Sequence, residues 1–244
     1  RGVSEVGFTE HSHNFRESAD LLNHPEFTTR HGHGFRVDDY IGVVVGAREE
    51  GYPVRLGIEM DYIEERRGQI QAFISEYPWD FVIGSVHWLG DWGFDIEPGS
   101  WDGRDVDEAY RTYFSTVERA VLTGMFDVLG HADVIKVFGH RPSREFQPEL
   151  LEWFDRIADA LARTGACLEV SSAGLRRVAR EAYPDTRLLS RARARNVPIT
   201  ISSDAHEPEE VGLGFEVTIP LVRSLGFQTL TVFNCRRGRQ ERIG

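Results

Sequence analysis

Side chains that bind metal ions recur at the ends of short apolar runs along this sequence. Five runs end in histidine, aspartate or glutamate, over residues 9–11, 57–61, 84–87, 130–133 and 202–206. Imidazole and carboxylate ligands suit Zn, Fe or Mn, and the absence of cysteine from these segments excludes a thiolate-rich structural zinc site. Two or more such ions close together lower the pKa of a shared water and hold a phosphoryl group during its transfer. The pattern therefore predicts a site for metal-dependent chemistry.

Six side chains in these segments are the candidate metal ligands: His11, Glu59, His87, His131, Asp204 and His206. Three of them, Glu59, Asp204 and His206, are also the candidate catalytic residues. Glu59 can bridge two cations because a carboxylate offers two oxygens, which an imidazole nitrogen cannot match. Asp204 and His206 share a face if the strand continues, and they diverge toward different ions if the chain turns there.

Each of these residues alone also has a structural interpretation. His87 and His131 could be hydrogen-bonded core histidines, and Glu59 could be a surface carboxylate. Asp204 could cap a helix that begins near Pro208, because aspartate accepts hydrogen bonds from free backbone amides there. Five strand ends with the same ligand types are hard to explain by structure alone, so a metal site is the favoured interpretation.

The remaining histidines lie in polar, loop-like surroundings and are expected to be solvated: His24, His31, His33 and His140. His13 is the exception, because it follows His11 by two residues and lies within reach of the same strand end. We place it among the candidate substrate-binding residues.

A second group of residues could recognise phosphate. Residues 171–177 combine two serines, a glycine and the pair Arg176 and Arg177 at the end of an apolar run. A guanidinium group matches the geometry of phosphate, so both arginines are candidate substrate-binding residues. The alternative is that they are solvated on a following helix. Lys136 and Arg141 are further cationic candidates. The aromatic residues Trp88, Trp92 and Phe94 either wall a small organic substrate or pack the rim of the fold.

The elements that must position these side chains alternate in type. Seven runs read as strands, over residues 3–9, 54–60, 81–86, 128–130, 167–171, 198–202 and 229–233. Amphipathic stretches between them read as helices, over residues 37–50, 69–76, 105–123, 146–161, 186–195 and 218–224. Such alternation favours parallel strands joined by right-handed crossovers. A βα barrel is the first choice, since barrel enzymes carry catalytic residues at the carboxyl ends of their strands, and an open doubly wound sheet is the second. No glycine-rich loop follows the first strand, which weakens the dinucleotide-binding option.

Composition limits the kind of protein. A chain of 244 residues with 41% hydrophobic and 27% charged residues fits one soluble globular domain, residues 1–244. The net charge of −11 argues against a nucleic-acid partner. No apolar run reaches the ~20 residues of a membrane span, and no signal peptide is visible. Cys167 and Cys235 are expected to be buried free thiols, which fits the cytoplasm. No pattern indicates an oligomeric state.

At this point the sequence resembles the polymerase and histidinol phosphatase (PHP) family. The similar blocks cover residues 8–12, 57–62, 82–90, 130–133, 172–176 and 203–212, in the family's order and across essentially the whole chain. The motifs Ser-Val-His-Trp-Leu-Gly at residues 85–90 and Ala-Gly-Leu-Arg at residues 173–176 resemble the histidinol-phosphatase branch.

The resemblance implies an α/β fold, a distorted (β/α)7 TIM-like barrel of the PHP type. It also implies two to three divalent transition metals (Zn, Fe or Mn) and a small phosphorylated amino-alcohol substrate. The activity implied is hydrolysis of L-histidinol phosphate, a step of histidine biosynthesis, by attack of a metal-bridging hydroxide. Carried over by motif, Glu59 bridges two metals, His87 and His131 bind one of them, Asp204 binds another, and His11 and His206 hold the third. Arg176 takes the phosphate-contacting position, with Arg177 beside it.

The chain also departs from the family pattern. The family opens with a strand bearing a metal-binding His-x-His motif and a helix, and the sequence here starts after that unit, so the N-terminal βα unit is expected to be missing. His31-Gly32-His33 has the same spelling but lies in a loop. His13 stands where the family has a small residue or proline. Two alternatives therefore stay open: a PHP-type phosphoesterase acting on another small phosphate ester or nucleotide, and a non-catalytic barrel that binds metal or phosphate.

Overall fold

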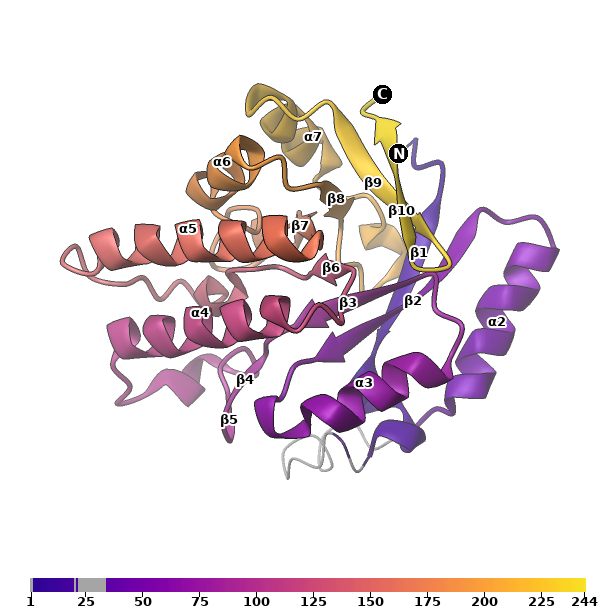
Figure 1. Ribbon diagram of the computed structural model, residues 1–244, viewed down its shortest axis with the longest axis horizontal. Coiled ribbons are helices and arrows are strands. Elements are labelled where there is room, and N and C mark those ends of the chain that lie inside the picture. Colours follow the sequence, from indigo (N-terminus) through magenta and orange to yellow (C-terminus); the bar gives the residue numbers. More distant parts are fainter. Residues whose placement is uncertain (1, 20, 22–33) are drawn as a thin grey trace.

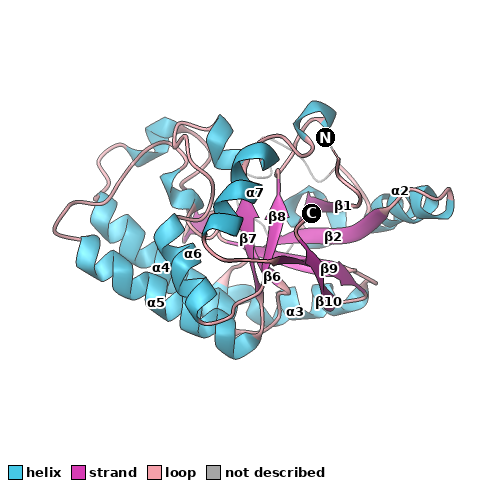
Figure 2. Ribbon diagram, turned by 90° about the horizontal axis from the view of Figure 1, so that it is seen from above, coloured by secondary structure: helices cyan, strands magenta, loops and turns pink. Residues whose placement is uncertain are grey.

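A six-stranded parallel sheet forms the centre of the computed structural model, which describes residues 2–19, 21 and 34–244. Its strand order is β1-β2-β3-β6-β7-β8, and every neighbouring pair is parallel. The strands are β1 (Val6–His11), β2 (Val54–Asp61), β3 (Phe81–Ser85), β6 (Val128–Leu129), β7 (Cys167–Ser171) and β8 (Ile199–Ser202). The sheet curls through these strands, as a distorted barrel requires (Figure 2). The predicted α/β fold with parallel crossovers is confirmed.

Helices connect the strands and cover the outer side of the curled sheet. They are α2 (Val37–Glu49), α3 (Arg67–Glu76), α4 (Val106–Leu122), α5 (Gln147–Thr164), α6 (Thr186–Ala194) and α7 (Phe215–Ser224). Figure 1 shows α4 and α5 lying side by side along the sheet. Helix α5 buries a stripe that includes Leu150, Phe154, Ile157 and Leu161, and Gly165 follows its last residue in the left-handed conformation that glycine favours. The predicted helix over residues 146–161 is thus confirmed, with its end three residues later.

Strand β2 shows how the sequence separates core from site. Leu56, Ile58 and Met60 are buried in the hydrophobic core. The alternate positions carry Gly57, Glu59 and Asp61, because successive side chains of a strand point to opposite faces. The core side is apolar, and the other side carries two carboxylates at the strand's carboxyl end.

The seventh predicted strand takes a different partner. β9 (Thr229–Asn234) pairs antiparallel with β10 (Arg237–Arg242) and is not part of the parallel sheet. A tight turn at Cys235 and Arg236, both with positive φ, reverses the chain there and makes the hairpin. A second small hairpin joins β4 (Trp88–Leu89) and β5 (Trp92–Gly93) directly after His87.

The remaining sequence expectations concern the two cysteines, the loop histidines and membrane-spanning segments. Cys167 is buried as expected, but Cys235 is exposed, because it occupies the hairpin turn, and neither cysteine forms a disulfide. His24, His31 and His33 lie outside the described residues. Among the helices that are described, none is both long enough and apolar enough to cross a membrane.

Candidate metal centre

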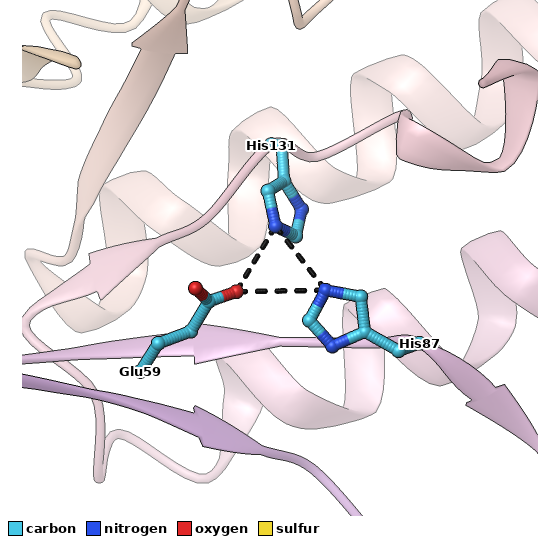
Figure 3. A group of neighbouring side chains, drawn as sticks. All are labelled: Glu59, His87 and His131. Atoms are coloured by element: carbon cyan, nitrogen blue, oxygen red, sulfur yellow. Dashed lines mark hydrogen bonds and ion pairs between the residues drawn. The ribbon is translucent and has the colours of Figure 1, made fainter. Parts of the chain in front are cut away.

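Three strand ends bring Glu59, His87 and His131 together in a buried triangle (Figure 3). The Nε2 atom of His131 lies 3.0 Å from Oε1 of Glu59, and Nε2 of His87 lies 3.5 Å from the same oxygen. The two Nε2 atoms are 3.3 Å apart. Ligands about 2.0 Å from a tetrahedral zinc ion lie roughly 3.3 Å from one another, so these atoms already have the spacing of a metal site. The donor set therefore fits one divalent transition metal.

The second oxygen of Glu59 faces a different imidazole. Oε2 lies 3.5 Å from Nδ1 of His11, which stands beside Glu59 in the β1–β2 register. That Nδ1 atom is buried and has no hydrogen-bond partner within the described residues. A carboxylate with an imidazole on each oxygen is suited to bridge two ions, which is the role predicted for Glu59.

Asp61 holds the His87 ring through the nitrogen that does not face Glu59. Its side chain is buried, and its Oδ1 lies 2.6 Å from Nδ1 of His87, which leaves Nε2 of that ring directed at Glu59. Carboxylates that hold the far nitrogen of a metal-binding histidine fix its tautomer and orientation. His13 approaches the other oxygen of Asp61, with its Nδ1 at 3.5 Å. The sequence reasoning assigned Asp61 no role, although it lies two positions after Glu59 and so on the same face of the strand.

Glu169 was also missed. It lies on β7 next to β6, is buried, and accepts a hydrogen bond from the backbone amide of His131. Its signal in the sequence was a lone acidic residue inside the apolar run of residues 167–171. Burial raises the pKa of this carboxyl group.

Opposite charges are concentrated in the triangle. Burial alone would raise the pKa of Glu59, but the imidazoles of His11 and His131 outweigh it and hold that pKa well below its ordinary value. Burial opposes protonation of His131, yet its hydrogen bond to Glu59 raises its pKa to about 9. His87 behaves in the same way beside Asp61, and its pKa is raised well above the ordinary value. A cation that binds here must therefore displace protons.

Asp204 and His206 approach from the loop after β8. Asp204 has a positive φ of 47°, so the chain turns there and the two side chains do not continue the strand. The rings of His11 and His206 have centroids 5.8 Å apart, which places His206 at the edge of the centre. Its side chain is 54% exposed. The short helix that begins at Pro208 is preceded by Glu207, so Asp204 is not its cap. The metal-binding roles of both residues remain predictions.

Arg176 reaches the same loop. Its Nη2 donates to the backbone carbonyls of Ser203 and Asp204, at 2.9 and 3.0 Å, and its Nε lies 3.2 Å from Oε1 of Glu210. Its Nη1 is buried without a hydrogen-bond partner in the part of the chain that the structure describes. A buried unpaired guanidinium nitrogen is suited to receive an anion. Arg177 is exposed, and its role in binding the substrate stays a prediction.

The other cationic candidates are engaged elsewhere. Lys136 is buried and lies 2.7 Å from Oδ2 of Asp133, and it donates to the carbonyl of Ala182. Arg141 pairs with Glu181. Both cations thus connect the loops after β6 and β7. Their contacts give no support for a role in phosphate recognition.

The aromatic residues after His87 pack mainly against one another. Trp92 meets Trp101 edge to face at 4.9 Å, and Trp101 stacks on His140 at 4.3 Å. Phe94 is buried against Tyr113. The packing interpretation is favoured for these aromatic residues. His140 lies in a loop as expected, but it is only partly solvated, because Trp101 stacks on its ring.

Comparison with known proteins gives a consistent family. The sequence model of the PHP domain matches residues 1–173, and a model described as PHP-associated matches residues 186–221. The probable histidinol-phosphatase of Deinococcus radiodurans is 35% identical over 201 residues, which cover 80% of this chain and 75% of that protein. The histidinol-phosphatase of Lactococcus lactis is 25% identical over 96% of this chain and 84% of its own.

A solved structure supports the fold. The histidinol phosphate phosphatase of Lactococcus lactis, in complex with zinc, L-histidinol and phosphate, superposes with a TM-score of 0.78. The alignment covers 98% of this chain and 88% of the other at 23% sequence identity. At that identity the likeness establishes the architecture alone.

Proposed function

The chain belongs to the PHP domain family, and on that premise we propose that it is a metal-dependent phosphomonoesterase that hydrolyses L-histidinol phosphate to L-histidinol and phosphate. The observation that carries the proposal is the buried triangle of Glu59, His87 and His131 at neighbouring strand ends. In barrel enzymes this edge of the sheet is where catalytic side chains gather. The 35% identity to the probable histidinol-phosphatase of Deinococcus radiodurans supports the choice of substrate.

We propose that the site binds two to three divalent ions of Zn, Fe or Mn, and the cluster of Glu59, His87 and His131 supports the binding of a divalent metal. Glu59, His87 and His131 would hold one ion, and the second oxygen of Glu59 with His11 would contribute to another. Asp204 and His206 would complete the ligand set from the loop after β8. When bound, such ions lower the pKa of water and neutralise charge on phosphate oxygens.

The protein's own groups would orient and stabilise the reacting phosphate. Asp61 holds the His87 ring in position, and Glu169 holds the His131 backbone. Arg176 would donate from Nη1 to a phosphate oxygen, where a guanidinium stabilises charge that grows as the P–O ester bond breaks. Water adds to phosphorus, and the alcohol oxygen leaves with a proton as L-histidinol. His13 and the exposed Arg177 are retained as proposed contacts to the substrate.

We also propose that residues 1–244 act as one PHP barrel domain. Strand β8 falls within the PHP-associated match and pairs in register with β7 of the PHP match, so the two matched segments share one sheet. A small phosphate ester as the partner, without nucleic acid, agrees with the acidic composition. Two cysteines without a disulfide suit a cytoplasmic enzyme.

The test is phosphate release from L-histidinol phosphate before and after chelator treatment, with re-addition of Zn or Mn. Release that chelation stops and metal restores would support both substrate and metal dependence. Chelator-sensitive release from other phosphate esters alone would favour a different PHP-type phosphoesterase. No release from any ester, with one metal ion or none bound, would favour a non-catalytic barrel.

A further inference from the structure

Glu210 joins two parts of the site that the sequence places far apart. Its Oε2 accepts a hydrogen bond from the backbone amide of His206 at 3.0 Å and lies 3.3 Å from Nη2 of Arg176. Its Oε1 lies 3.2 Å from Nε of the same arginine. One carboxylate thus contacts the loop that carries two predicted metal ligands and the arginine predicted to bind phosphate.

Arg176 closes the connection from the other side. While its Nε and Nη2 face Glu210, Nη2 also donates to the carbonyls of Ser203 and Asp204. Asp204 has a left-handed backbone conformation, which is strained for a residue other than glycine and must be held by its surroundings. The arginine therefore binds the turn that sets the direction of the Asp204 side chain.

Two further contacts fix the segments that Arg176 and Glu210 occupy. The hydroxyl of Ser203 accepts a hydrogen bond from the amide of Gly212 at 3.0 Å. The hydroxyl of Ser172, just before the Arg176 turn, donates to the carbonyl of Leu213 at 2.5 Å. The loop over residues 203–213 and the turn over residues 172–176 are thus packed as one unit, in which Glu210 supplies the negative charge that faces the guanidinium.

We propose that Glu210 is a positioning residue that couples phosphate binding by Arg176 to the order of the metal-ligand loop at Asp204 and His206. The inference rests on the proposed function, since it assumes that Arg176 meets a phosphate and that the loop meets a metal. Glu210 holds Nε and Nη2 of Arg176, which leaves the buried Nη1 for the anion, and it anchors the His206 amide at the same time. Binding of phosphate and of metal should then depend on the same side chain.

The experiment measures binding of inorganic phosphate and of zinc, each without turnover. Calorimetry gives the dissociation constant for phosphate in the zinc-loaded protein, and elemental analysis after dialysis gives the zinc content. The variants are E210Q, which removes the charge and keeps an acceptor, E210D, which keeps the charge, and E210A. The matched control is E207Q, which removes a carboxylate from an exposed position of the same loop.

In E210Q we expect phosphate to bind about tenfold more weakly, because a charge-assisted hydrogen bond is lost from the arginine that binds it. In E210A we expect a larger loss and a zinc content lower by about one ion. E210D should recover part of the phosphate affinity, and E207Q should match the wild-type protein.

For phosphate affinity, R176A/E210A should equal R176A alone, because Glu210 acts through Arg176. Circular dichroism checks that each variant is folded.

Three results would overturn the inference: E210Q and E207Q behaving alike in both binding assays, the losses in R176A and E210A adding in full, or a folded wild-type protein that binds no phosphate. If E210A does not fold, the comparison of E210Q with E210D still decides. Hydrolysis of L-histidinol phosphate tests the proposed function separately from the two binding assays. Zinc and phosphate binding that depend on Glu210, without hydrolysis of L-histidinol phosphate, would reject the substrate and keep the positioning role.

Discussion

The two halves of the proposed metal centre differ in how the fold holds them. The side chains of Glu59, His87 and His131 are only 6–9% exposed and extend from the ends of neighbouring strands. The side chains of Asp204 and His206 are 24% and 54% exposed and come from the loop after β8. We call the first set the strand-borne half, because the pairing of strands places these side chains. We call the second set the loop-borne half, because its position depends on the contacts that hold the loop after β8.

This difference separates two kinds of side-chain function. In the strand-borne half, imidazoles and carboxylates already neutralise one another, so each side chain interacts with the rest of the fold as well as with the proposed metal. In the loop-borne half, Arg176 and Glu210 hold backbone groups, and the side chains of the predicted ligands Asp204 and His206 have few contacts of their own. Substitutions in the first half should disturb stability and activity together, and those in the second should disturb activity alone.

The largest effect should come from E59A. It removes the carboxylate that contacts three imidazoles and leaves buried positive charge without a partner, which is strongly destabilising. We expect turnover to fall by more than about a thousandfold, with loss of at least one metal ion and a lower melting temperature. Steady-state kinetics, elemental analysis and thermal unfolding measure the three effects. E49A, at an exposed position on α2, is the control. Near-wild-type turnover in E59A would defeat the metal assignment.

H206A should lower activity with little effect on stability. Its half-exposed ring contributes little to packing, so removing it should leave the melting temperature of the metal-free protein unchanged. If His206 is a ligand, turnover should fall by about a hundredfold and one ion should be lost. Steady-state kinetics, elemental analysis and thermal unfolding, run in parallel with E59A, measure these effects. Full metal content and full turnover would remove His206 from the site and confine the ligands to the strand-borne half.

D61N tests whether the Asp61 carboxylate orients the His87 ring for metal binding. The amide keeps the size of the side chain but removes the charge from the contact with Nδ1 of His87. Outer partners of metal-binding histidines typically contribute a factor of roughly ten to a hundred in metal affinity. Zinc titration against a competing chelator measures this directly. An unchanged zinc affinity would mean that the strand-borne half is oriented by strand register alone, without help from Asp61.

The sequence predicted the strand-borne half better than the loop-borne half, for a physical reason. Parallel strands end at one edge, so placing Glu59, His87 and His131 there required only the alternation of strands and helices. Asp61 was within reach of the same argument, since side chains two positions apart share a face. The approach of Arg176 to the turn at Asp204 was not accessible, because it depends on loop geometry over a separation of 28 residues. The antiparallel hairpin of β9 was missed because a short apolar run does not reveal its pairing partner.

The smallest expected effect is a pH dependence that belongs to the strand-borne half and changes sign with metal. The pKa of His131 is about 9 in the folded protein, above the ordinary value of 6.5. Its stabilising contribution is therefore fully present below pH 6.5 and is lost as the pH rises through 9. His87, with its pKa raised well above the ordinary value, acts in the same direction.

The chelator-treated protein should accordingly unfold at lower temperature as the pH rises from 6.5 to 9, and H131N should weaken this dependence. Zinc should reverse the trend over the same range, because the deprotonated imidazole is the ligand and protons compete with the metal. Thermal unfolding at several pH values, with and without zinc, makes the comparison. A melting temperature that rises with pH in the chelator-treated protein would show that Glu59 and His131 do not form the buried charged pair on which the strand-borne half depends.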